Sequence, residues 1–319
     1  MLKLDNVSKT YRTGTFGGKQ LCAVRDVTFE IKDGEVVSLI GESGSGKSTI
    51  GKMILRLIAI NEGTITFDGL DVGSLKRGDL REYYRKVQGV FQDPFSSYNP
   101  IFKADRVFEV MHDHFYRSMR QKEWTAKIHD SLESVGLNPE HVLGKYPHQL
   151  SGGQLQRFLI ARALLLEIRF LVADEIISML DASTRIDVLN LLADLKERDL
   201  GVLFITHDLS LGYYISEQAA ILYRGCIVEM GQTEKIYDNP IHPYTRMLMA
   251  SVPRLDKKWE DVEIELRAKQ GQLSDGCVYF ERCPEHQRQT CCRDDRPTLR
   301  LAEEGHFVAC QRSGKEESS

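Results

Sequence analysis

Residues 41–49 read "GESGSGKST", and this stretch satisfies the pattern GxxxxGK[ST] of a phosphate-binding loop. The apolar run "EVVSLI" before it predicts a buried strand, and "KSTIGKMILRLI" after it predicts a helix over residues 47–58. Glycines let backbone amides converge on phosphate oxygens, and a helix N-terminus adds a favourable dipole. We therefore expect Lys47 to reach the β- and γ-phosphates of a nucleotide and Ser48 to bind Mg²⁺. The nucleotide-binding residues expected here are Gly41, Ser43, Gly44, Gly46, Lys47, Ser48 and Thr49.

The composition is that of an ordinary globular chain. Of its 319 residues, 42% are hydrophobic and 28% are charged, which is enough for one large domain with its own core and an appendage. The formal net charge of −4 provides no basic field for holding nucleic acid, so we expect no nucleic-acid partner. The first residues lack a signal peptide, and the most apolar stretch, 158–180, is interrupted by charges. We expect no membrane span and a cytoplasmic location.

The stretch "FLVADE" (residues 170–175) predicts a strand that ends in two carboxylates. Asp174 suits a water-mediated contact to Mg²⁺, and Glu175 suits polarising the water that attacks a phosphate. An acidic pair after a strand also serves as a helix N-cap, so the pair means little alone. Its position after the phosphate loop gives it a catalytic interpretation.

The stretch "LSGGQLQRFLIARALL" (residues 150–165) decides the family. Ser151, Gly152 and Gly153 precede a predicted helix, whose exposed amides form a second anion site. The complete "LSGGQ", placed between a phosphate loop and an acidic strand end, closely resembles the signature of ATP-binding cassette (ABC) ATPases. The resemblance covers residues 1–250.

That resemblance implies a fold class and a partner. The fold is α/β, a P-loop NTPase cassette with a RecA-like core, an antiparallel β subdomain and a helical subdomain at about residues 95–165. In the family, ATP is sandwiched between two cassettes, with the phosphate loop of one facing the signature of the other. A second, related ABC ATPase subunit is therefore expected, with Ser151, Gly152, Gly153 and Gln154 of this chain contacting the nucleotide of its partner.

Other positions match the family one by one. Tyr11 resembles the aromatic residue that stacks on adenine, and His207 resembles the switch histidine that contacts the γ-phosphate. Gln92 resembles the glutamine that senses both Mg²⁺ and the attacking water. Asp181 resembles the aspartate that communicates between the paired sites. One departure stands out: the run "ADEIISMLD" lacks the proline usual after the catalytic glutamate, which predicts a looser turn around Glu175.

Two further stretches indicate a subfamily. Residues 90–100, "VFQDPFSSYNP", and 223–253, "YRGCIVEMGQTEKIYDNPIHPYTRMLMASVP", closely resemble the oligopeptide and dipeptide importer ATPases, a group that also serves nickel and, in some members, oligosaccharides. The resemblance implies an ATPase at the cytoplasmic face of the cell membrane, two permease subunits and an extracytoplasmic solute-binding protein. Two other classes stay open: a soluble ABC protein acting on ribosomes or DNA, and a redox sensor.

After "PYTRMLMASVP" (residues 243–253) charge rises and hydrophobicity falls, which predicts a cassette over 1–255 and a C-terminal extension over 256–319. Five of the seven cysteines lie in this extension. A reducing cytosol argues against disulfides, and the spacing of these cysteines names no metal. The extension resembles the C-terminal segment of peptide-importer ATPases, which in some members holds a [4Fe–4S] cluster; zinc and unligated thiols stay open. Cys22 and Cys226 are expected to be buried packing residues. The candidate ligands are Cys277, Cys283, Cys310 and one of Cys291 and Cys292.

Overall fold

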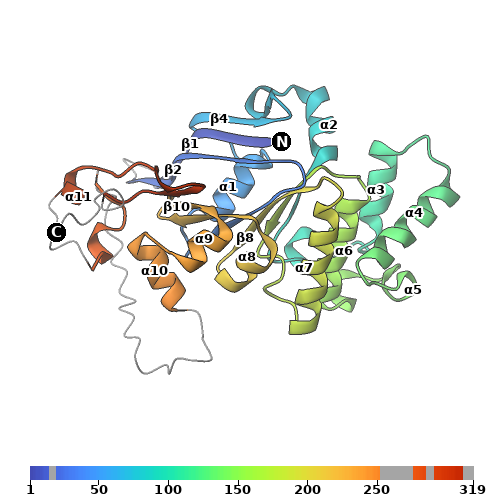
Figure 1. Ribbon diagram of the computed structural model, residues 1–319. Coiled ribbons are helices and arrows are strands. Elements are labelled where there is room, and N and C mark those ends of the chain that lie inside the picture. The colour runs from blue at the N-terminus through green and yellow to red at the C-terminus, as the bar shows by residue number, and fades with distance from the viewer. Residues whose placement is uncertain (14–18, 252–275, 285–290, 312–319) are drawn as a thin grey trace. The chain divides into compact units, whose positions relative to one another are not determined.

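The computed structural model describes residues 1–13, 19–251, 276–284 and 291–311 (Figure 1). The chain folds into two compact units, each built from separate stretches of sequence. Unit 1 contains Met1 and residues 31–35 and 74–203, and the rest belongs to unit 2. The expected boundary of the extension, near residue 255, lies outside the described residues. Among the helices that are described, none is long and apolar enough to cross a membrane.

Unit 2 contains two groups of strands. The first group has the order β2-β1-β4-β5, in which β1 and β4 are antiparallel and Leu4 lies opposite Ile65. The second has the order β11-β12-β10-β9-β3, in which β3 and β9 are parallel. All five residues of β3 are buried, as expected for an apolar strand inside a sheet. The strands are β1 (Leu2–Thr13), β2 (Lys19–Ile31), β4 (Glu62–Phe67), β5 (Leu70–Asp71), β3 (Val36–Ile40), β9 (Gln218–Tyr223), β10 (Cys226–Gln232), β11 (Arg300–Glu303) and β12 (His306–Val308).

The helix after the phosphate loop is shorter than the sequence predicts. It ends at Ile54 rather than at residue 58, because Arg56 adopts a left-handed conformation (φ 52°). The amides of Leu57 and Arg56 donate to the carbonyls of Lys52 and Met53, a hydrogen-bonded cap that closes a helix end. The helices of unit 2 are α1 (Lys47–Ile54), α8 (Leu209–Ile215), α9 (Thr233–Asp238), α10 (Pro243–Ala250) and α11 (Cys291–Asp294).

Unit 1 is mostly helical. Its strands β6 and β7 are parallel, with Val87 opposite Phe170. Helices α3 to α6, green to yellow-green in Figure 1, occupy the region that the sequence predicts to be helical. Their core is aromatic, since the Phe108 and Phe158 rings stack with centroids 4.9 Å apart and Trp124 is 1% exposed. The elements are α2 (Arg77–Lys86), β6 (Val87–Val90), α3 (Arg106–Phe115), α4 (Gln121–Ser134), α5 (Pro139–Val142), α6 (Gly152–Leu164), β7 (Phe170–Asp174) and α7 (Ala182–Lys196). Strand β8 (Gly201–Thr206) belongs in part to each unit.

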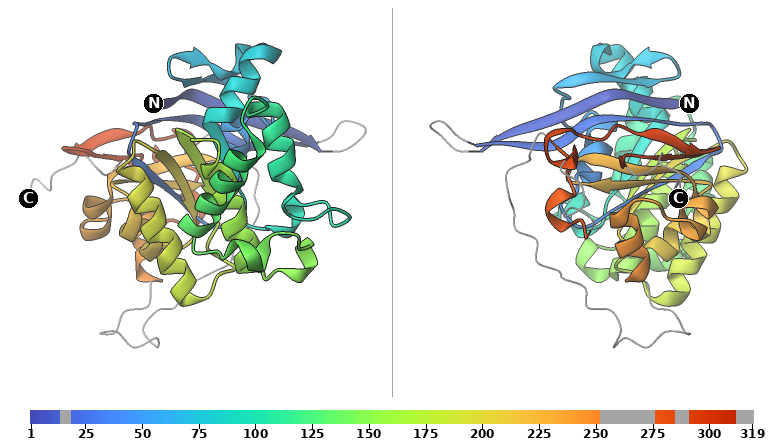
Figure 2. Two further views of the ribbon diagram at one scale, coloured as in Figure 1. Left: turned by 90° about the vertical axis from the view of Figure 1, so that its right-hand side faces the viewer. Right: turned by 60° about the vertical axis from the view of Figure 1, so that its left-hand side comes forward.

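A buried ion pair attaches the extension to the rest of unit 2. Strand β12 adds to β10 as an antiparallel neighbour, so the β11–β12 hairpin continues the sheet (Figure 2). There His306 Nε2 lies 2.7 Å from Glu229 Oε1, and both side chains are fully buried. Glu229 also accepts the backbone amides of Ile241 and His242, and Nδ1 of His306 lies 3.0 Å from Glu303. Both oxygens of the buried carboxylate thereby have hydrogen-bond donors, which a buried charge requires.

We predict that His306 makes the stability of this hairpin depend on pH. Burial acts to lower the pKa of His306, but its hydrogen bonds to Glu229 and Glu303 outweigh burial and raise that pKa. The stabilisation is therefore complete below about pH 6.5, the pKa of an unfolded histidine, and is lost as pH rises through the raised folded-state value. Amide hydrogen exchange in β12 should accelerate over that range.

The variant His306→Gln should unfold the hairpin more readily by about 3 kcal/mol, because the charge of Glu229 stays buried without a cation. In this variant, amide exchange in β12 should also lose the part of its pH dependence that comes from titration of His306. His141→Gln, at an exposed histidine of α5, is the matched control. Equal pH slopes in the parent and in His306→Gln would show that this histidine does not titrate with the hairpin.

Candidate nucleotide site

The phosphate loop joins β3 to α1 in unit 2, as the sequence pattern predicts. A Cβ atom on Gly41 would lie 2.2 Å from the carbonyl oxygen of Leu222. At Gly46, with φ 108°, it would lie 2.4 Å from the carbonyl oxygen of Ala23. Both approaches are too close for any side chain, so these two positions require glycine.

Lys47 is held inside the loop. Lys47 is only 5% exposed. Its Nζ donates to the carbonyl oxygens of Gly41 at 2.6 Å and Glu42 at 2.9 Å. These acceptors are uncharged, so phosphate oxygens would be stronger partners for the ammonium. Ser43, Gly44 and Ser48 are exposed, which leaves the open face of the loop available to a ligand.

Two other predicted residues belong to the same unit. Tyr11 lies on β1, is half-buried, and has the ammonium of Lys9 5.3 Å from its ring centroid. His207 is exposed and directly follows β8, the neighbour of β3 in the sheet. The next residue, Asp208, accepts the amide of Ser210 and caps α8. His207 is therefore placed at the junction between a sheet strand and a capped helix.

The carboxylate pair lies at the end of β7 in unit 1. Asp174 is 6% exposed, and Glu175 is half-buried with a left-handed backbone (φ 51°), a conformation that is costly for a residue with a side chain. The carbonyl of Glu175 accepts both the amide and the hydroxyl of Ser178. Ile176 and Ile177 are buried. These contacts hold the turn and give no support to the expectation of a loose one.

The signature residues begin α6 in unit 1. The Ser151 hydroxyl accepts the amide of Gln154, and the Gln154 side chain accepts the amide of Ser151, which is a capping box. Gly152 and Gly153 form the first turn, so their amides point out of the helix start. The predicted second anion site is therefore a properly capped helix N-terminus.

Asp181 is the N-cap of α7 in unit 1. Its carboxylate accepts the Thr184 amide at 2.9 Å and the hydroxyls of Ser183 and Thr184. The Thr184 amide first, and then these hydroxyls, lower the pKa of Asp181 to about 2. The carboxylate is thus ionised at any physiological pH and fixed at the start of a helix.

Gln92 is exposed and follows β6. The backbone just before it is held by two side chains of α6 that were not predicted from the sequence. The side chain of Gln156, only 1% exposed, donates to the carbonyl of Phe91 at 3.2 Å. Arg162 donates to the carbonyl of Gly89 at 3.3 Å. Helix α6, which begins at the signature, therefore grips the backbone just before Gln92. The sequence did contain a signal for this contact. Gln156 is a polar residue next to Leu155 on the apolar side of the predicted helix, and a polar side chain buried there needs a hydrogen-bond partner.

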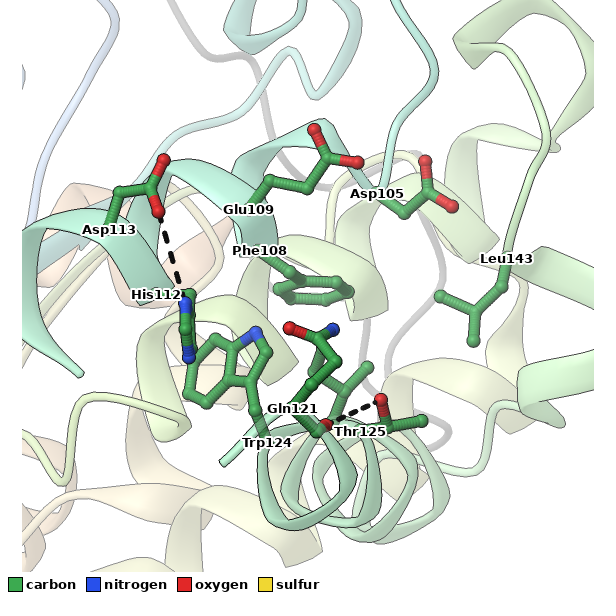
Figure 3. A pocket seen from close by; sticks show the side chains of 10 residues that line it. Asp105, Phe108, Glu109, His112, Asp113, Gln121, Trp124, Thr125 and Leu143 are labelled. Carbon is green, nitrogen blue, oxygen red and sulfur yellow. Dashed lines mark hydrogen bonds and ion pairs between the residues drawn. The ribbon is translucent and has the colours of Figure 1, made fainter. Parts of the chain in front are cut away.

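A separate cavity of about 290 Å³ lies between α3 and α4. Figure 3 shows the side chains of α3 opposite those of α4, with Phe108 and Trp124 among them. Asp113 in its lining pairs with His112 at 3.9 Å. None of the lining residues belongs to the predicted nucleotide set, so we assign this cavity no part in nucleotide binding.

The thiol of Cys277 is partly buried and interacts with two other thiols of the extension. Burial first, and then the thiols of Cys310 and Cys283, raise the pKa of Cys277, and its amide donates to the carbonyl of Cys292 at 2.8 Å. Within the described ranges, no three His, Cys, Asp or Glu side chains are arranged to hold a metal ion. The side chain of Cys291 lies outside the description. Cys22 and Cys226, expected to be buried, are half-buried.

Comparison with known proteins agrees with these features. A family model described as "ABC transporter" matches residues 24–178, and one described as "Oligopeptide/dipeptide transporter, C-terminal region" matches residues 228–292. The oligopeptide transport ATP-binding protein AppF of Bacillus subtilis is 40% identical over 323 residues, covering 97% of this chain and 96% of AppF. The chain belongs to the ABC transporter family. It is an ATPase cassette of that family.

Two other relatives and a solved structure also match most of this ABC protein. OppF of Bacillus subtilis, also an oligopeptide transport ATP-binding protein, is 40% identical and covers 90% of both chains. A putative peptide import ATP-binding protein of Brucella ovis is 40% identical and covers 98% of both. The dimeric structure of the cassette MJ0796 in a post-hydrolysis state with ADP and Pi matches with a TM-score of 0.67 and 32% identity, covering 73% of this chain and 99% of that one. The predicted cassette fold is confirmed.

We predict that Gln156 supports hydrolysis by this ABC protein without binding nucleotide itself. In Gln156→Leu, the Phe91 carbonyl loses its donor and the segment bearing Gln92 is less restrained, so the ATPase rate of the assembled complex should fall about tenfold, the cost of one lost hydrogen bond to a buried group. MgATP affinity should stay within about twofold. Gln121→Leu, at an exposed position of α4, should match the parent. An equal loss in both variants would remove the special role of Gln156.

Proposed function

We propose that this chain is the ATP-hydrolysing subunit of an ABC importer that takes up oligopeptides or dipeptides. One observation carries the proposal: an ABC transporter match is followed, in the same chain, by a match to the oligopeptide/dipeptide transporter C-terminal region. The full-length relatives named for oligopeptide transport support it. Nickel and oligosaccharide are the alternative cargoes, because cargo is selected by the permeases and the binding protein rather than by the cassette.

In the proposed reaction, the triphosphate of ATP replaces the carbonyl partners of Lys47 and accepts amides of the loop over 41–49. The donor set also fits Mg²⁺, which prefers oxygen ligands: Ser48 presents an exposed hydroxyl at the start of α1, and Asp174 and Gln92 would supply the other oxygens. Mg²⁺ bound there would neutralise developing charge on the phosphates.

The remaining roles follow from position at strand and helix ends. Glu175 polarises the attacking water, and His207 contacts the γ-phosphate from the end of β8. Tyr11 stacks on adenine. Ser151 and its neighbouring amides, with Asp181, serve the nucleotide that is bound to the partner cassette. A monomer would accordingly hydrolyse ATP poorly.

The proposed partners are a second related cassette subunit, two permeases and, through the complex, an extracytoplasmic solute-binding protein. We place the chain at the cytoplasmic face of the cell membrane as a peripheral subunit. Closing of two cassettes around ATP draws the permeases together, because ATP binds the closed state more tightly than the open one. Co-purification distinguishes this from other classes: permeases favour import, whereas ribosomes or DNA favour a soluble ABC protein.

The test is ATP-dependent uptake of a labelled oligopeptide by vesicles that contain the complex with its permeases and binding protein. Glu175→Gln should lower both ATPase and uptake at least about 100-fold, the contribution of a general base. Glu197→Gln, an exposed carboxylate at the end of α7, should leave both unchanged. Undiminished ATPase in Glu175→Gln refutes its role. Uptake of nickel or an oligosaccharide in place of peptide refutes the proposed cargo.

We further propose that the extension holds a [4Fe–4S] cluster on Cys277, Cys283, Cys310 and one of the adjacent pair Cys291 and Cys292. The concentration of five cysteines between residues 277 and 310 and the backbone hydrogen bond from Cys277 to Cys292 support it. Zinc and unligated thiols are the alternatives. A bound cluster would cross-link the segment that contains Cys277 and Cys283 to the segment that contains Cys291, Cys292 and Cys310.

Anaerobically purified protein should be brown and contain about four iron and four sulfide ions per chain. Cys277→Ser should lose the iron, whereas Cys22→Ser should retain it, because Cys22 lies on β2 outside the extension. Stoichiometric zinc, or colourless protein without iron or sulfide, overturns the cluster.

A further inference from the structure

The extension contacts the phosphate loop directly. The guanidinium of Arg282 donates to both carboxylate oxygens of Glu42, at 2.9 to 3.2 Å, and its side chain is only 10% exposed. Glu42 is the second residue of "GESGSGKST". A bidentate arginine–carboxylate pair is among the stronger and more directional contacts in proteins. Two segments 240 residues apart are thereby joined at the loop that should receive ATP.

Glu42 is held at three points. Its amide donates to the Tyr244 hydroxyl at 2.9 Å, its side chain pairs with Arg282, and its carbonyl accepts Nζ of Lys47 at 2.9 Å. The first two contacts fix the residue whose carbonyl holds the lysine. The orientation of Lys47 therefore depends on residues outside the loop.

Arg282 is itself fixed by its surroundings. Its guanidinium carbon lies 5.8 Å from the ring centroids of both Tyr223 and Tyr279, and it contacts Sδ of Met247 at 3.4 Å. Those two rings pack edge to face, 5.1 Å apart. Arg282 also belongs to a tight turn from Cys277 to Cys283 closed by three backbone hydrogen bonds. The arginine is therefore presented by a packed, ordered element.

We propose that Arg282 is a positioning residue for nucleotide binding, which fixes Glu42 and cancels its charge where the phosphates of ATP bind. The inference rests on the proposed nucleotide role of the phosphate loop. Without Arg282, an uncompensated carboxylate would lie beside a polyanion and repel it. It would also be free to pair with Lys47, the cation that the phosphates need.

The experiment is calorimetric titration of the purified full chain with MgATP. Arg282→Gln should weaken binding about tenfold, the effect expected of one like charge near the phosphates. The double variant Arg282→Gln with Glu42→Gln should return to within about threefold of the parent, because the repelling charge is gone. A purely structural loss of the extension would not be rescued in this way.

A matched control lies one residue away. Glu281 pairs with Arg224 at 3.7 Å, a contact between the same turn and another part of unit 2 that does not involve the phosphate loop. Glu281→Gln should bind MgATP as the parent does. Thermal unfolding without nucleotide should show all variants folded, and a double variant as weak as Arg282→Gln overturns the proposal.

Lys47→Ala separates this inference from the proposed function. If Lys47→Ala binds MgATP normally, the nucleotide role of the loop is wrong and the inference falls with it. If Lys47→Ala loses binding while Arg282→Gln binds as the parent does, only the role of Arg282 is overturned.

Discussion

The phosphate loop is wedged between the backbone carbonyls of two other segments, Ala23 of β2 and Leu222 of β9. Because those carbonyls belong to sheet strands, the loop cannot shift to admit a side chain at Gly41 or Gly46. This fit determines where α1 begins and where Nζ of Lys47 lies. The other residues of unit 2 that are proposed to affect nucleotide binding either hold this loop in place or contact the nucleotide that it would bind.

The helix starts and turns around the candidate site that the sequence predicts correctly have local causes. The loop over 41–49 needs a left-handed glycine at its end, and the signature needs a hydroxyl and an amide three residues apart to cap α6. Such requirements are met within one turn of chain and leave a readable pattern. The end of α1 is also local, but it was predicted wrongly, because Arg56 takes a conformation that usually marks a glycine.

Other contacts could not be predicted because they join distant segments through residues with no periodic signal. Glu229 and His306 are ordinary charged positions in the sequence, yet both are fully buried against each other. Glu42 and Arg282 are likewise ordinary charged positions in the sequence, yet they form a bidentate pair across 240 residues. A polar residue buried in an apolar helix, such as Gln156, was detectable in principle, but its partner is a backbone carbonyl and carries no sequence information.

The extension contacts the rest of unit 2 through His306, which pairs with Glu229 of β10, and through Arg282, which pairs with Glu42 of the phosphate loop. Two of the cysteines proposed to hold a metal centre, Cys277 and Cys283, bound the turn that presents Arg282. If that turn fixes Glu42, then any ligand that orders the turn also favours the loop conformation that binds ATP. Thermodynamic linkage makes the effect reciprocal, so ATP must favour the ordered turn by the same factor. A cysteine centre at the C-terminal end of an ATPase cassette therefore need not approach the reacting phosphates in order to influence them, because the connection runs through one arginine.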